Sequence, residues 1–124
     1  MKRILFFSIA TLLFSCELAS DEPLQASYEE LLSQQQEIIK LSESVSCTNS
    51  SDWKITPMGS KACGGPSRYI AYHVSVEKDF LDLVNRYTAL EKAYNEKNNV
   101  ISDCMMVVAP KSVTCEGNKP VLVF

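Results

Sequence analysis

Residues 47–72, CTNSSDWKITPMGSKACGGPSRYIAY, decide how this chain folds. This central block holds the only tryptophan, two of the five cysteines and three of the four glycines, and segments with helical spacing lie on both sides of it. Gly59 precedes Cys63, while Gly64 and Gly65 follow it, so we expect positive φ angles on either side of this sulfur. The block therefore predicts a tightly bent loop beside a disulfide.

Short strands are predicted around this loop and near the C-terminus. Residues 53–56 alternate apolar and polar side chains until Pro57 interrupts them, and residues 69–74 are β-prone. Residues 113–115 and 121–124 flank a turn-forming sequence at 116–119, which is typical of a hairpin.

A first helix is predicted from residue 21 or 23 to about residue 44, with Ser20 or Asp21 as its cap. Its apolar residues recur every seven positions and are Leu24, Leu31, Ile38 and Val45. Three arrangements stay open: packing on the chain's own domain, a coiled-coil pair between two chains, or a mobile stalk. Gln35 and Ser42 stand where a coiled-coil seam needs apolar residues, which favours packing on the domain.

A second helix is predicted from Ser75 or Val76 to about Lys97. Its apolar residues, at spacings of three and four, are Phe80, Leu83, Val84, Tyr87, Leu90 and Tyr94. Ser75 suits an N-cap, and Asn98 with Asn99 suits a left-handed stop. Two long helices with a small antiparallel sheet or hairpins predict a disulfide-stapled α+β domain over residues 23–124.

The N-terminus has the layout of a secretory signal. Lys2 and Arg3 precede an apolar run at residues 4–14 that is too short to span a bilayer. The sequence Leu13-Phe14-Ser15-Cys16 resembles the lipobox of bacterial lipoproteins. That resemblance implies removal of residues 1–15, acylation of Cys16, and a tether at residues 16–22. Two or more acyl chains give stable membrane anchoring.

The same resemblance places the protein in the cell envelope as an outer-membrane lipoprotein, either periplasmic or surface-exposed. Removal of residues 1–15 leaves 109 residues, with 10 basic and 15 acidic side chains. This acidic balance argues against nucleic acid as a partner, because nucleic-acid binding selects for basic patches.

The remaining cysteines are an even number in an exported domain, which implies two disulfides. These four residues are Cys47, Cys63, Cys104 and Cys115. If the helices pack antiparallel, Cys47 and Cys104 lie too far apart to bond, and of the three possible connectivities we favour Cys47 with Cys63 and Cys104 with Cys115. The wide cysteine spacing, a single histidine and the lack of Cys-x-x-Cys predict no metal site, no redox motif and no cofactor.

No catalytic motif accompanies His73, the single histidine, so the sequence does not predict an enzyme. A short, lipid-tethered, cross-linked domain is similar in build to bacterial envelope inhibitors, immunity proteins and accessory subunits. We therefore expect a binding module whose partner is another envelope or extracellular protein. The candidate recognition loop lies at residues 57–69 and its side chains are Lys61, Ser67, Arg68 and Tyr69.

Two alternatives accompany this expectation. The glycines of the loop could serve only the fold, and the protein could instead be a structural component that self-associates through Leu24, Leu31 and Ile38. Residues 47–72 and 102–108 also resemble small uncharacterised exported bacterial proteins, a resemblance that implies no particular function.

Overall fold

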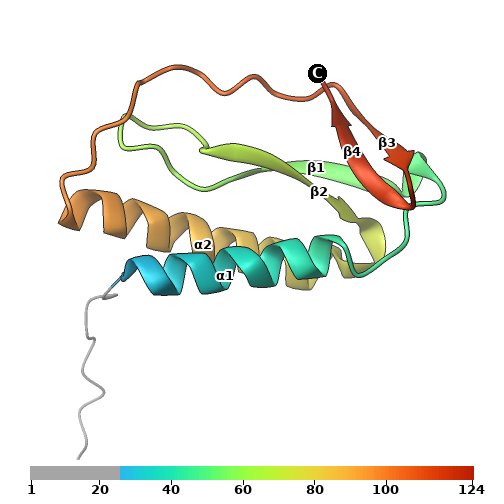
Figure 1. The fold of residues 1–124 in the computed structure, drawn as a ribbon, viewed down its shortest axis with the longest axis horizontal. Helices are drawn as coiled ribbons and strands as arrows, with labels where there is room; N and C mark the ends of the chain where they lie inside the picture. Colours follow the sequence, from blue (N-terminus) through green and yellow to red (C-terminus); the bar gives the residue numbers. More distant parts are fainter. Residues whose placement is uncertain (1–25) are drawn as a thin grey trace, which may run out of the picture.

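The computed structural model describes residues 26–124 and has two antiparallel helices beneath a β-hairpin (Figure 1). A second hairpin packs at one end of the first. The elements are α1 (Tyr28–Ser42), β1 (Trp53–Met58), β2 (Arg68–His73), α2 (Glu77–Lys97), β3 (Ser112–Glu116) and β4 (Lys119–Val123). The predicted mixture of helices and small antiparallel sheets is confirmed. The expectation of two long helices holds only for α2, which has 21 residues, because α1 has 15.

Helix α1 begins later than predicted. Ser27 has extended backbone angles, and its side-chain oxygen accepts a hydrogen bond from the Glu30 backbone N–H at 3.1 Å, so Ser27 is the N-cap. The predicted caps Ser20 and Asp21 lie outside the described residues, as do Cys16 and the predicted signal and tether. Leu31 and Ile38 are buried against the rest of the domain. The prediction that this apolar face packs on its own chain is therefore confirmed.

Helix α2 has the predicted apolar face and the predicted end. Phe80, Val84, Tyr87 and Leu90 are all buried, and Asn99 follows the helix with a φ of 49°. Ser75 is not its N-cap, because it lies in a 3-10 turn at Val74–Val76. There the His73 ring nitrogen Nδ1 accepts a hydrogen bond from the Ser75 backbone N–H at 3.1 Å.

The β1–β2 hairpin separates two hydrophobic clusters, because successive side chains of a strand point to opposite faces. Met58 and Tyr72 pack with the helices in the larger cluster, where the ring of Tyr72 stacks on Phe80 with centroids 5.0 Å apart. Trp53 and Ala71 belong to the other cluster. The further members of this second cluster are Cys47, Val45, Val113, Cys115 and Leu122. The β3–β4 hairpin thus covers the second face of the β1–β2 hairpin at its Trp53 end.

The turn between β3 and β4 explains the register of the second hairpin. Gly117 and Asn118 have φ angles of 55° and 61°, the left-handed pair required by a two-residue turn whose twist matches the strands. The predicted C-terminal hairpin is confirmed. Pro57 does not end β1, as the sequence suggested, because its missing N–H is tolerated in a sheet of only two strands.

Residues 100–111, here called the strap, connect α2 to β3. Figure 1 shows this segment running back over the β1–β2 hairpin from the end of α2 to the second hairpin. It forms neither helix nor strand. Its return course determines which cysteines meet.

The favoured disulfide pairing was wrong. Cys47 bonds Cys115, and Cys63 bonds Cys104. The expected exclusion of a Cys47–Cys104 bond holds, since the strap places Cys104 over the loop after β1. The same strap then carries the chain back to the end of α1, where Cys115 reaches Cys47. The favoured pairing failed because the long second helix and the strap bring residues that are distant in the sequence together at each end of the fold.

Candidate functional site

The loop between β1 and β2, here called the glycine loop (residues 59–67), is held by a polar row on α2. The Gly59 backbone N–H donates to Thr88 Oγ1 at 3.0 Å. The Ser60 backbone N–H donates to Glu91 Oε2 at 2.6 Å, and the Asn95 side-chain amide donates to the Ser60 carbonyl at 2.7 Å. Because positions three and four apart lie on one face of a helix, these side chains form a single docking stripe for the loop.

Glu91 is the centre of this stripe. Its Oε2 also accepts a 2.6 Å hydrogen bond from the hydroxyl of Ser67, and its Oε1 accepts one from the hydroxyl of Tyr87 at 3.2 Å. Burial and the charge of Glu91 raise the pKa of Tyr87 to about 12. The carboxylate therefore ties both ends of the glycine loop to the helix.

A side chain at position 59 would be strained and would displace its neighbours. The φ of Gly59 is +80°, and an added Cβ would collide with Glu91 Oε2 and lie 2.8 Å from the Ser67 hydroxyl. Gly64 and Gly65 also have positive φ, at 96° and 79°, but open space surrounds them. The predicted left-handed backbone around Cys63 is therefore confirmed, and at Gly59 close packing adds a second requirement.

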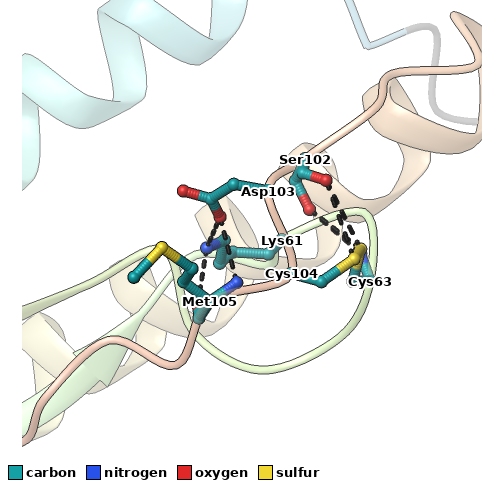
Figure 2. Close-up of polar contacts among 6 residues, drawn as sticks. All are labelled: Lys61, Cys63, Ser102, Asp103, Cys104 and Met105. Carbon is teal, nitrogen blue, oxygen red and sulfur yellow. Dashed lines mark hydrogen bonds and ion pairs between the residues drawn. A yellow bond between two sulfur atoms is a disulfide. The ribbon is translucent and has the colours of Figure 1, made fainter.

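Lys61 crosses from the loop to the strap. Figure 2 shows its ammonium group between Asp103 and Met105, where it forms an ion pair with Asp103 and donates to the Met105 carbonyl at 2.7 Å. Asp103 Oδ1 also accepts from the Met105 backbone N–H at 3.2 Å. The hydrogen bond from Lys61, followed by that from Met105, lowers the pKa of Asp103.

The Cys63–Cys104 cystine lies beside this ion pair. Ser102 accompanies it, with its hydroxyl 3.2 Å from Cys63 Sγ (Figure 2). A covalent bond and an ion pair thus join the strap to the glycine loop. Because both segments lack regular secondary structure, these links take the place of a backbone hydrogen-bond ladder.

Two of the predicted recognition residues make contacts within the fold. The Lys61 side chain is only 16% exposed and points to the strap, while Ser67 donates to Glu91. Arg68 is exposed at the start of β2, and Tyr69 is half-buried. The glycine loop therefore presents few of its own polar side chains.

The strap supplies the exposed apolar side chains of this region. Ile101 is 93% exposed, Met105 is 70% exposed, and Val100 is also exposed. We call these three residues, next to the Cys63–Cys104 cystine, the apolar corner. Sequence reasoning missed it because it searched the loop rather than the strap. An available signal was the uncharged run Met105-Met106-Val107-Val108 outside any predicted strand.

The four described cysteines are paired in disulfides, and His73 makes contacts within the fold. His73 contacts Trp53 edge to face, with ring centroids 5.4 Å apart, and its Nδ1 lies 2.7 Å from the Ser75 hydroxyl. Across residues 26–124, no three His, Cys, Asp or Glu side chains cluster in a way that could hold a metal ion. Neither helix in this part of the chain is long and apolar enough to cross a membrane.

Comparison with known proteins identifies no relative. No protein-family model matches the sequence, and no curated protein or solved structure is significantly similar to it.

Proposed function

We propose that this protein is a lipid-anchored binding module of the bacterial cell envelope, of the inhibitor, immunity or accessory type, and that it recognises another envelope or extracellular protein. The exposed apolar corner at Val100, Ile101 and Met105 carries this proposal. Exposed apolar side chains concentrated on one short segment favour contact with a protein. The adjacent cystine and ion pair reduce the entropy that the strap loses on binding.

The lipid anchor rests on the resemblance of residues 13–16 to a lipobox. Its test is the intact mass of the protein from the bacterial envelope. We expect loss of residues 1–15, added acyl chains at Cys16, and a deficit of four hydrogens for the two cystines. A processed chain that begins elsewhere or lacks acyl groups would contradict the anchor without touching the binding proposal.

Binding rather than catalysis is proposed because the groups with catalytic potential serve the fold. His73 is held between Trp53 and Ser75, and Lys61 is held by Asp103. Turnover of any envelope substrate that is abolished by His73→Ala would contradict this part of the proposal.

The partner experiment compares two exposed isoleucines. Full chains carrying Ile101→Glu, or Ile39→Glu as a control on α1, are crosslinked in living cells and recovered with their partners. Because Ile101 is 93% exposed at the apolar corner and Ile39 is 40% exposed on a helix, we expect Ile101→Glu alone to abolish capture of one specific protein. A captured set that is unchanged by Ile101→Glu would contradict the proposed surface.

A second candidate is an envelope assembly component that self-associates through α1. Leu31 and Ile38 are enclosed in the domain and so are unavailable to a partner, and Leu24 lies outside the described residues. A different stripe of α1 exposes Tyr28, Leu32 and Ile39. Self-association that Leu32→Glu abolishes, measured by sedimentation of the full chain in mild detergent, would favour this candidate.

A further inference from the structure

The middle of the strap has the properties of an unpaired edge strand. Met106 is 93% exposed and Val108 is 68% exposed. Across the described residues, no backbone N–H or C=O of Met106, Val107 or Val108 has a hydrogen-bond partner. Unpaired backbone groups beside exposed apolar side chains are a template for pairing with another strand.

Antiparallel pairing of the strap with a second copy would be self-complementary. With Val107 opposite Val107 of the second copy, Met106 lies opposite Val108. The N–H and C=O groups of Met106 and Val108 then form four hydrogen bonds across a twofold axis. Pro110 has no N–H, so the ladder ends next to it.

The charges at the two ends of the strap favour the antiparallel direction. Asp103 and Lys111 are equally distant from Val107 in the sequence, so antiparallel pairing brings each Asp103 towards Lys111 of the second copy. Asp103 is 65% exposed and uses only Oδ1 for its contacts, while Lys111 has no ion pair within residues 26–124. A parallel arrangement would instead place like charges together.

We propose that two copies of this chain associate through antiparallel pairing of residues 105–109, centred on Val107 and flanked by two Asp103–Lys111 ion pairs. The occupant of this edge is thus a second copy. The proposal goes beyond the binding function, and its segment shares only Met105 with the apolar corner. Its failure would leave the Ile101-dependent capture of another protein untouched.

The register is tested by disulfide trapping in the full chain, in mild detergent under air. Directly opposed residues of an antiparallel pair have Cα atoms about 4.5–5.5 Å apart, within reach of a disulfide. Val107→Cys should therefore give a covalent dimer on a non-reducing gel. In the control Met105→Cys, the two equivalent residues are offset by four positions, about 14 Å, and should remain uncrosslinked. Equal crosslinking of both variants would overturn the register.

Two further substitutions test the contributions of the backbone hydrogen bonds and of the ion pairs. The dimer dissociation constant is measured by sedimentation equilibrium. Val108→Pro removes two of the four hydrogen bonds and should raise the constant by at least about tenfold, while Val108→Thr keeps the N–H and should leave it within about twofold. Lys111→Glu places a carboxylate near each Asp103 of the other copy and should raise the dissociation constant by about fivefold. Lys40→Glu, an exposed change on α1, is the charge control.

The proposal is overturned if the wild-type chain stays monomeric at about millimolar concentration and Val107→Cys gives no covalent dimer. It is also overturned if the monomer binds neutral phosphatidylcholine vesicles through Met106 and Val108, because the edge would then serve a lipid surface. Dimerisation that Leu32→Glu abolishes and Val108→Pro leaves intact would overturn it in favour of α1.

Discussion

The two cystines join regions of opposite character. Cys47 is 2% exposed and lies in the cluster between the hairpins, with Cys115 packed against it, whereas Cys63 and Cys104 are both exposed. Cys47–Cys115 connects the chain after α1 to the second hairpin, so it fixes elements that already share a core. Cys63–Cys104 connects two irregular segments that share polar contacts and little buried surface. The first cystine belongs to the core, and the second fixes the strap against the glycine loop at the surface.

The largest effect should follow loss of the buried cystine. The bond closes a loop with a sequence separation of 68, worth about 4 kcal/mol in the entropic model. Cys47→Ala with Cys115→Ala also leaves a gap in the second cluster, so we expect the free energy of unfolding to fall by more than about 4 kcal/mol. Urea denaturation measures this. A loss no greater than that caused by removing the exposed pair would break the comparison.

Loss of the exposed cystine should act mainly on the strap. Its sequence separation is 41, and Cys63→Ser with Cys104→Ser should lower the free energy of unfolding by about 2–4 kcal/mol. Amide exchange at residues 102–105 should accelerate, while exchange within α2 follows only the global change.

Mild reduction separates the two bonds without substitution. Because thiolates must reach a sulfur to exchange, a reductant should open Cys63–Cys104 first, and alkylation followed by mass spectrometry should tag those two residues. Earlier labelling of Cys47 and Cys115 would contradict the assignment of that bond to the core.

A matched pair of glycines tests how the loop is held. Gly59→Ala and Gly65→Ala introduce the same methyl group at φ angles of 80° and 79°, but only the first meets Glu91 and Ser67. We expect Gly65→Ala to destabilise the protein by about 1 kcal/mol and Gly59→Ala by about 2–4 kcal/mol. Thermal unfolding measures both, and equal losses would show that the Glu91 contact does not constrain the loop.

Alkaline pH should lower the stability of the protein through ionisation of the buried Tyr87 hydroxyl. The pKa of Tyr87 is raised from 10.0 to about 12 by burial and by Glu91, so the folded state favours the neutral hydroxyl. Its contribution to stability is complete below pH 10 and is lost as the pH rises towards 12. The urea midpoint should therefore fall over this interval, and Tyr87→Phe should flatten the fall. Parallel profiles for the two proteins would contradict the role of Tyr87.

Acid pH should weaken the contact between Lys61 and Asp103, and this is the smallest of the expected effects. Lys61 lowers the pKa of Asp103, so the ionised carboxylate contributes stability above the ordinary value of 3.8 and loses it as the pH falls below that value. Amide exchange at Met105 should accelerate below about pH 4, relative to Asp103→Asn, in which the effect should be absent. Exchange that is equally pH-dependent in the variant would contradict it.

The sequence indicated the candidate region but not its residues. The glycines around Cys63 have the expected left-handed backbone, yet Lys61 and Ser67 turned out to be fold contacts. Sequence reasoning missed Glu91, whose contacts come from residues 24 and 31 positions away. A charged residue on a helix normally faces water, and nothing local distinguishes one that receives a loop.

Local spacing by itself determined the apolar faces of both helices, the C-terminal hairpin and the bent loop, because these depend on neighbours within a few residues. The disulfide pairing, the fate of Lys61 and the exposure of Ile101 were decided only by the tertiary structure. The physical reason is the course of the strap. An irregular segment has no periodicity to reveal where it runs, yet its path decides which distant groups meet and which remain exposed to solvent.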